Sequence, residues 1–382
     1  MARDPARVDK YSPRPFGADR MRSPARPRIT VEAPPNIALV KYWGIRDRTL
    51  ALPYNSSISV TLAGLRTRTT VRFDPALSDD RVELNGRPAV GGPRDGVVRF
   101  LDRVRAMAGI DERAEVRSAN NFPTASGLAS SASGFAALAG AASLAVGLAL
   151  SPRALSRLAR FGSGSASRSI FGGFVEWRAG SRPDGRDCYA RPLHGPDHWP
   201  ELLDLVLLVK DAPVKEVRSA DAMQATVATS PYFAGRQRDL PGRIDRIRRA
   251  IARRDADRLF PLIMEECDSF RRVCETTRPS LDYLTATSRA ILDGVRDLNR
   301  SAGRPIAAYT HDAGAHVHVF TLDRHARTIR DSLGGIVGIE RMLRVRPGPG
   351  ARTIAPAGRG PTARVGRSRG TAVRGRSTRR GR

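Results

Sequence analysis

The sequence Asn-Asn-Phe-Pro-Thr-Ala-Ser-Gly-Leu-Ala-Ser-Ser-Ala-Ser-Gly occupies residues 120–134, and a run rich in Ala, Leu and Gly follows it to about Leu150. A proline, a glycine and small hydroxyl residues ahead of good helix formers indicate a tight loop that opens onto a helix N-terminus. The unpaired N–H groups and the dipole of such a terminus attract anions. The local alternative is a Ser/Gly-rich turn that only caps a buried helix. The stretch is not a Walker loop, because no lysine follows a glycine at the required spacing.

The two ends of the chain are basic and poor in large apolar residues. Residues 1–28 carry eight Lys or Arg against three Asp, and residues 346–382 carry eleven Arg and no acid, so the ends supply +5 and +11 of the formal net charge of +27. We expect both ends to be disordered, because neither can bury enough apolar surface to offset chain entropy. The remaining +11 on the middle of the chain suits substrates that carry phosphates and would also bind nucleic acid loosely through non-specific charge contacts, so a basic nucleic-acid-binding protein is a remote alternative function.

The Arg/Gly-rich C-terminal segment has three interpretations: a nucleic-acid arm, a solvated tail, or translation of a wrong reading frame. It has no interleaved aromatic residues that could stack on bases. We therefore expect no specific nucleic-acid partner.

Cysteine usage and hydropathy indicate where the protein works. The three cysteines, Cys188, Cys267 and Cys274, show no paired metal-ligand spacing, which favours a reducing compartment without structural zinc. The Ala-rich segment after Gly134 is interpreted as a buried core helix, and no other charge-free apolar run reaches the roughly 18 residues that span a membrane. The N-terminus has no apolar signal core. We expect a cytoplasmic protein that binds no membrane.

The order of the elements indicates the fold class. Apolar or alternating runs predict strands, and 3.6-residue periodicity predicts helices. Strands are expected at 29–33, ahead of Lys41, after a turn within 52–62, and at 69–73, 114–118, 170–177, 202–209, 306–309 and 316–322. Helices are expected at 95–108, 150–161, beyond Met223, and at 239–254, 255–273, 281–298 and 329–334. This order predicts an α+β fold with antiparallel sheets rather than a regular βαβ repeat.

A second polar cluster precedes the strand that ends at Trp177. Ser163 and Ser165 alternate with small residues ahead of Arg168, so several hydroxyls and one guanidinium can face an oxyanion. The alternative is a flexible Ser/Gly linker, which the apolar strand immediately after it makes less attractive.

Pro123-x-x-x-Gly127-Leu-x-Ser-Ser-Ala resembles the phosphate loop of the GHMP kinase superfamily, and the fuller string at 120–132 is similar to one branch, diphosphomevalonate decarboxylase. Three further segments resemble that branch and follow the same order: 36–47 with 55–57, 163–177, and Asp312-Ala-Gly. The resemblance therefore covers about residues 29–344. The resemblance implies a two-lobed GHMP fold with lobes at 29–200 and 201–345, ATP in the cleft between them, and possible homodimerisation.

The family phosphorylates the tertiary 3-hydroxyl of mevalonate 5-diphosphate with ATP, then eliminates phosphate and carbon dioxide to leave isopentenyl diphosphate. A tertiary alcohol is a poor nucleophile, so a carboxylate must lie within hydrogen-bond reach of it. Asp312 resembles the catalytic aspartate, and Lys41 resembles the lysine that keeps it ionised. Without the other motifs, Asp312 before a glycine would be interpreted as a turn residue.

The resemblance also assigns the remaining site residues. Arg168 and Asn36 match positions that hold the carboxylate end of the substrate, and Tyr42, Ser163 and Ser165 match positions that bind its phosphates. The ATP phosphates are expected on the loop residues Pro123, Ser126, Gly127, Ala129, Ser130 and Ser131. Mg²⁺ retains waters and needs few protein ligands, so it would be carried mainly by those phosphates and no protein metal site is expected.

Two departures from the family pattern concern the phosphate end of the substrate. Ile45 stands where the family has a lysine, and Ala220 stands where an arginine is expected; Arg218 can compensate by reaching in. Fewer cations suit a monophosphate better, so the alternative function is phosphomevalonate decarboxylase, which makes isopentenyl phosphate. A non-decarboxylating mevalonate kinase fits less well, because the decarboxylation branch needs Asp312 together with Arg168.

Three histidines near Asp312 could suggest a metal site. His311, His316 and His318 are instead expected to flank Asp312 and to alternate along a strand.

Overall fold

The structure is a computed structural model that describes residues 26–123, 130–213 and 217–354. Its helices are α1 Gly91–Ala108, α2 Ser130–Ala145, α3 Pro152–Ala159, α4 Ala166–Ser169, α5 Ser219–Thr229, α6 Phe233–Arg253, α7 Ala256–Glu275, α8 Ala286–Ser301 and α9 Ala326–Gly334. Its strands are β1 Ile29–Ala33, β2 Asn36–Val40, β3 Ile45–Asp47, β4 Leu52–Pro53, β5 Ser57–Thr61, β6 Thr67–Asp74, β7 Arg81–Leu84, β8 Arg87–Pro88, β9 Arg113–Asn120, β10 Phe174–Trp177, β11 Ala190–His194, β12 Leu202–Val209, β13 Ala307–Thr310, β14 Val317–Leu322, β15 Ile339–Val345 and β16 Arg352–Ile354.

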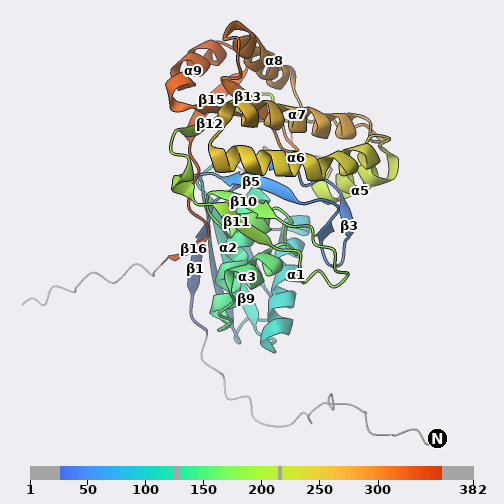
Figure 1. The fold of residues 1–382 in the computed structure, drawn as a ribbon. Coiled ribbons are helices and arrows are strands. Elements are labelled where there is room, and N and C mark those ends of the chain that lie inside the picture. Colours follow the sequence, from blue (N-terminus) through green and yellow to red (C-terminus); the bar gives the residue numbers. More distant parts are fainter. Residues whose placement is uncertain (1–25, 124–129, 214–216, 355–382) are drawn as a thin grey trace, which may run out of the picture.

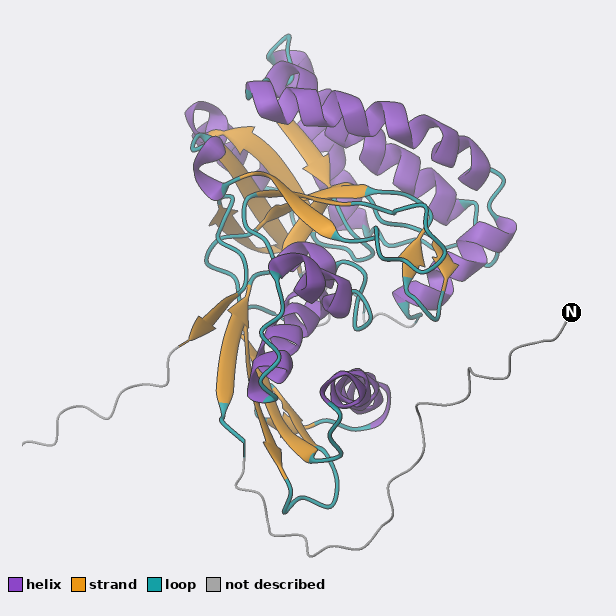
Figure 2. Ribbon diagram, turned by 60° about the horizontal axis from the view of Figure 1, so that its bottom comes forward, coloured by secondary structure: helices purple, strands orange, loops and turns teal. Residues whose placement is uncertain are grey.

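A six-stranded sheet in the order β16-β1-β6-β9-β7-β8 forms the outer part of the N-terminal lobe, and all its pairs are antiparallel except β7 with β9. Helix α2 packs on β1 and β6 (Figures 1 and 2). Its buried residues are almost all Ala, Gly or Ser, which lets the helix approach the sheet closely. A Cβ on Gly140 would lie only 3.2 Å from Val31.

Two four-stranded sheets lie nearer the middle of the molecule. The sheet β11-β10-β5-β2 belongs to the N-terminal lobe, and β13-β14-β12-β15 is built wholly from residues after 200. The long helices α6 and α7 run side by side (Figure 1), α7 packs against β2 and β13, and Arg248 of α6 pairs with Glu176 of β10. One hydrophobic core joins both lobes, because Leu39 of β2, Val60 of β5, Val206 of β12 and Ile263 of α7 belong to the same buried cluster. The predicted α+β class with antiparallel sheets is confirmed.

Local signals explain where several elements begin. Ser151 caps α3 by accepting a hydrogen bond from the amide of Ala154, as the Ser-Pro sequence predicts. Helix α8 begins at Ala286 rather than 281, because Thr285 and Ser288 form a capping box. Helix α6 begins at Phe233, six residues before its expected start, and continues through Pro241. The short strands β7 and β11 escaped prediction because they are only four and five residues long and each buries a single residue fully, so neither shows a clear alternation.

The predicted start of the disordered C-terminal tail at Arg346 is wrong. Residues 352–354 form β16, which pairs antiparallel with β1, and Pro347 bridges Leu62. Glycines that suggested disorder are needed for close approach, since a Cβ on Gly348 would lie 2.6 Å from Ala63 Cα. Residues 1–25 and 355–382 of the two expected disordered ends lie outside the described residues.

Two further observations concern membrane-spanning helices and the cysteines. Within the described ranges, no helix is long and apolar enough to cross a membrane. Cys188, Cys267 and Cys274 are all buried, and none of the three forms a disulfide.

Candidate active site

A cavity of about 750 Å³ lies between the two lobes. It brings together nine of the residues that the sequence assigned to the site: Lys41, Tyr42, Ser130, Ser131, Ser163, Ser165, Arg168, Arg218 and Asp312. These residues come from the end of β2, the start of α2, the segment around α4, the start of α5 and the turn after β13. Segments that are up to 271 positions apart therefore meet in one cavity.

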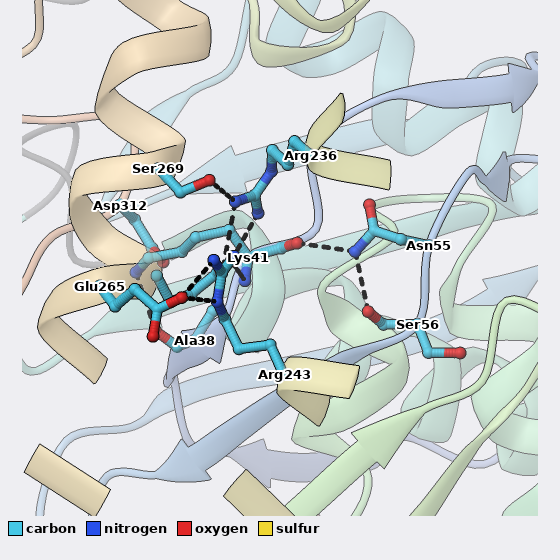
Figure 3. A network of polar contacts seen from close by, with 10 residues as sticks. Ala38, Lys41, Asn55, Ser56, Arg236, Arg243, Glu265, Ser269 and Asp312 are labelled. Atoms are coloured by element: carbon cyan, nitrogen blue, oxygen red, sulfur yellow. Dashed lines mark hydrogen bonds and ion pairs between the residues drawn. The ribbon is translucent and has the colours of Figure 1, made fainter. Parts of the chain in front are cut away.

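Lys41 and Asp312 form an ion pair in the lining of this cavity. The Lys41 Nζ donates to Asp312 Oδ1 at 2.8 Å and to the Ala38 carbonyl oxygen at 2.8 Å (Figure 3). The Lys41 side chain is 3% exposed, whereas that of Asp312 is 25% exposed and can meet a substrate. Burial alone would raise the pKa of Asp312, but the charge and hydrogen bond of Lys41 outweigh it and hold that pKa below its ordinary value.

Arg168 is a buried cation held by neutral partners. Its Nε donates to Asn36 Oδ1 at 3.0 Å and its Nη1 donates to Ser57 Oγ at 2.6 Å. The Asn36 amide donates in turn to Ser169 Oγ at 2.8 Å. Burial lowers the pKa of Arg168 to about 10, although the charge of Asp312 opposes this. Two of its five N–H donors are engaged by these contacts, and Arg168 lines the cavity without a salt bridge to any carboxylate of the described residues.

Asn36 contacts Arg168 but does not line the cavity. It is 1% exposed. Its contact with the cavity is therefore indirect and runs through Arg168. Ser57 has the same relation to Arg168; it was part of a recognised motif but not among the predicted site residues.

A cluster of hydroxyls lies along one side of the cavity. Ser163 Oγ is 3.1 Å from Ser165 Oγ and 3.3 Å from Ser131 Oγ, so the two predicted phosphate sites are adjacent. The Tyr42 ring packs edge-on against Trp177. A Cβ on Gly164 would lie only 2.6 Å from the Tyr42 ring, so this position leaves no room for a side chain. Burial raises the pKa of Tyr42, which keeps its hydroxyl protonated as a donor.

The predicted ATP loop is only partly described. Ser130 and Ser131 form the first turn of α2 and line the cavity, whereas Pro123 is exposed before the gap. Ser126, Gly127 and Ala129 lie outside the described residues. The hydroxyls and amides of a helix N-terminus provide donors for phosphate oxygens.

Ile45 and Ala220, the two residues that depart from the family pattern, both line the cavity, as expected for positions near the substrate. Arg218 also lines it, and its Nη2 would lie 3.1 Å from a Cβ on Gly92 in the first turn of α1. Sequence reasoning missed Arg48, which lines the cavity and pairs with Asp221 at 2.9 Å. The sequence after Ile45 offers two cations, Arg46 and Arg48, and only the structure separates them, because Arg46 donates to the Pro53 carbonyl oxygen and does not line the cavity.

The three histidines contact protein groups. His311 Nδ1 lies 2.7 Å from the Asp312 carbonyl oxygen, and burial together with Lys41 lowers the pKa of His311 to about 4. His316 Nδ1 accepts from the amide of Val209. His318 Nδ1 is 2.6 Å from Asp204 Oδ2. Among the described residues, no group of three or more His, Cys, Asp or Glu side chains is placed to hold a metal ion.

Comparison with known families gives the same assignment to both lobes. The family model described as the diphosphomevalonate decarboxylase-like N-terminal domain matches residues 33–190. The model described as the mevalonate 5-diphosphate decarboxylase C-terminal domain matches residues 205–344.

Curated relatives match over most of their length. Diphosphomevalonate decarboxylase mvd1 of Aspergillus fumigatus is 41% identical over 327 residues, which cover 81% of this chain and 81% of the relative. The diphosphomevalonate decarboxylase of Homo sapiens is 42% identical over 311 residues, which cover 77% of each chain.

Solved structures share the fold. The mevalonate diphosphate decarboxylase of Enterococcus faecalis is 36% identical with a TM-score of 0.80, and the match covers 87% of this chain and 100% of that one. A structure described as MDDEF in complex with MVAPP, AMPPCP and magnesium is 36% identical with a TM-score of 0.81 and the same coverage. The Staphylococcus aureus enzyme is 35% identical with a TM-score of 0.81, covering 87% and 98%. This chain belongs to the diphosphomevalonate decarboxylase family.

Proposed function

We propose that this chain is an ATP-dependent decarboxylase that converts mevalonate 5-diphosphate to isopentenyl diphosphate, with release of ADP, phosphate and carbon dioxide. The observation that carries the proposal is the ion pair between the buried Lys41 and the partly exposed Asp312, which faces a cavity shared with Arg168 and the hydroxyls of Ser130, Ser131 and Ser163. The relatives named diphosphomevalonate decarboxylase and the related structure with MVAPP and AMPPCP support the substrate and the nucleotide.

The first step is phosphoryl transfer to the 3-hydroxyl. The ionised Asp312 accepts or orients the hydroxyl proton while the alcohol oxygen forms a bond to the γ-phosphorus and the bond to ADP breaks. Lys41 keeps Asp312 ionised, so the base is ready at neutral pH. Ser130 and Ser131, at the start of α2, donate to the phosphates of ATP.

The second step removes phosphate and carbon dioxide from the phosphorylated intermediate. The C–O bond breaks with its electron pair on the departing phosphate, and the tertiary carbon gains cationic character. The electrons of the C–C bond to the carboxylate then form the double bond of the product. Arg168, oriented by Asn36 and Ser57, holds the carboxylate until it leaves as carbon dioxide.

Mg²⁺ neutralises part of the polyphosphate charge when it is bound with ATP. The hydroxyls of Ser130, Ser131 and Ser163 are compatible with a metal-bound polyphosphate, because they supply donors without adding charge. The related structure described as a complex with AMPPCP and magnesium supports this assignment. ATP and Mg²⁺ are therefore the cosubstrate and metal that the site accommodates.

The substrate is the diphosphate rather than the monophosphate. The cavity retains Arg48 and Arg218 as two exposed cations that can replace the charges absent at Ile45 and Ala220. Their presence supports the diphosphate, and a bound diphosphate would compete with Asp221, which pairs with Arg48 at 2.9 Å, for the Arg48 guanidinium.

The test compares three substrates with purified full-length protein, ATP and Mg²⁺, measuring release of ADP and carbon dioxide. Mevalonate 5-diphosphate is expected to give the highest kcat/KM, and mevalonate 5-phosphate and mevalonate much lower values. Asp312→Asn serves as the inactive control. A higher kcat/KM with mevalonate 5-phosphate would replace the proposed substrate with the monophosphate.

Homodimerisation and a cytoplasmic location remain predictions. Sedimentation analysis of the purified protein tests the first, and fractionation of the source cells tests the second.

A further inference from the structure

Glu266 of α7 is a fully buried carboxylate that contacts the backbone of Lys41. It is 0% exposed, and its Oε1 accepts a hydrogen bond from the Lys41 amide at 2.9 Å. Glu266 does not line the active-site cavity. The contact therefore joins a helix of the C-terminal lobe to the residue that follows β2 in the N-terminal lobe, on the side of Lys41 that does not face the cavity.

Two arginines of α6 hold this carboxylate in place. Arg236 donates to both oxygens of Glu266, and Arg243 Nη1 donates to Glu266 Oε2 at 2.8 Å. Their side chains are 2% and 6% exposed. With the amide of Lys41, four N–H donors converge on one carboxylate, which is about its full acceptor capacity. Figure 3 shows Arg236 and Arg243 converging beside Lys41.

The neighbouring contacts leave Lys41 little freedom. Its carbonyl oxygen accepts from Asn55 Nδ2 at 2.9 Å, so a side chain holds each polar group of its backbone. Its Nζ is then placed between the Ala38 carbonyl and Asp312. Because β2 ends at Val40 after a register shift, the Lys41 amide has no strand partner and depends on Glu266.

Burying three charges beside a hydrophobic core is expensive, and an apolar cluster could join the same helices at lower cost. The carboxylate of Glu266 lies where α7 contacts the backbone of Lys41, the lysine that pairs with Asp312. We infer that Glu266 is a positioning residue for the decarboxylase reaction, fixing the backbone of Lys41 so that its ammonium lies against Asp312. This inference rests on the proposed function.

The main variant is Glu266→Gln, which keeps the shape of the side chain but turns an amide toward arginine donors. Displacement of Lys41 is expected to lower kcat on the order of 10- to 100-fold, because small misplacements of catalytic groups have effects of this size. KM values for ATP and mevalonate 5-diphosphate should change by less than about threefold, since the groups that contact substrate remain.

The acid limb of the kcat–pH profile is the readout that a purely structural role would not move. Asp312 faces Lys41, Arg168 and His318, and Lys41 makes the largest contribution that lowers its pKa. When Lys41 moves away, burial dominates and the pKa of Asp312 rises. Glu266→Gln should therefore shift the acid limb of kcat to higher pH.

The matched control is Glu265→Gln, one position earlier on α7. Glu265 is 46% exposed and its hydrogen bonds within the described part of the chain go to Arg243 rather than to Lys41; it does not line the cavity. Its kcat and acid limb should stay at the wild-type values. Thermal unfolding of each variant, measured in parallel, shows that the assays compare folded protein.

A folded Glu266→Gln enzyme with wild-type kcat and an unmoved acid limb overturns the inference, as does a loss of kcat without a shift of the limb. If Glu266→Gln fails to fold, Glu266→Asp decides, because it keeps the charge but withdraws it by one methylene. A lower kcat and a raised limb in that variant support the inference, and wild-type values refute it. Wild-type enzyme that does not release carbon dioxide from mevalonate 5-diphosphate would instead refute the proposed function.

Discussion

At the scale of single residues, the chemistry depends on how tightly Lys41 and Asp312 are held together. Lys41 is almost completely buried, whereas Asp312 keeps a quarter of its side chain exposed to the cavity. A buried cation beside a partly exposed carboxylate favours an ionised base that a substrate can still reach. The pair is therefore suited to accept a proton from a weakly acidic alcohol.

The pH dependence of activity tests this pair. Because Lys41 holds the pKa of Asp312 below the ordinary aspartate value of about 3.9, the carboxylate should stay ionised throughout pH 5–8. Lys41→Met removes the cation and leaves the burial, so the pKa of Asp312 should rise and the activity of the variant should fall toward acidic pH. An inflection that appears in the pH profiles of both enzymes arises from titration of the substrates. An additional acidic inflection in the wild-type profile alone would contradict a lowered pKa of Asp312 in the wild-type enzyme.

Asp312→Asn removes the proton acceptor while keeping the size of the side chain. We expect kcat to fall by about 10²–10⁴-fold, the usual contribution of a positioned acid or base. ATP binding, measured by calorimetry, should change little. Retention of more than about a tenth of the wild-type kcat would exclude Asp312 as the catalytic base.

Arg48 is expected to contribute to recognition of the terminal phosphate. Arg48→Met should raise KM for mevalonate 5-diphosphate several-fold and leave KM for ATP nearly unchanged, because the side chain lines the cavity on the Ile45 side. Arg87→Met is the control, since Arg87 is an exposed residue of β8 that does not line the cavity. Equal KM values in wild type and Arg48→Met would show that another cation binds the phosphate.

At the scale of elements, the sequence predicts best where a motif and a buried strand adjoin. Lys41 follows β2 and Asp312 follows β13, so a strand of apolar residues delivers each to the cavity. Glu266 escaped prediction because it is one acid among many on a charged helix, and only packing shows that it faces inward. Residues 346–354 were misjudged because their glycines and arginines have the composition of a disordered tail, although the glycines permit close contacts with Ala63 and Ile170.

Strand β16 should stabilise the outer sheet by pairing with β1, which would otherwise have an unpaired edge. A chain that ends after Gly350 should unfold at a lower urea concentration than one that ends after Ile354. We expect a difference of about 1–3 kcal/mol in the free energy of unfolding, from two or three backbone hydrogen bonds. Both chains lack the same later residues, so the comparison isolates β16. Identical urea midpoints would show that β16 adds no stability.

At the scale of the whole molecule, the cleft is built on a core shared by both lobes. Buried side chains of β2 and β5 pack with those of β12, α6 and α7 in one cluster. The cavity lies beside this shared core, so the relative placement of Lys41 and Asp312 depends on packing between the lobes. No single motif in the sequence contains this information, although the order of the four motifs predicts that their residues meet.

The most direct test of the central claim is the stoichiometry of one turnover on mevalonate 5-diphosphate. ADP, inorganic phosphate and carbon dioxide would be measured in the same reaction of the full-length protein with ATP and Mg²⁺. If Lys41, Asp312 and Arg168 carry out phosphorylation followed by elimination, the three products should appear in equal amounts. Release of ADP without carbon dioxide would show a kinase that stops at the phosphorylated intermediate, and would contradict the account.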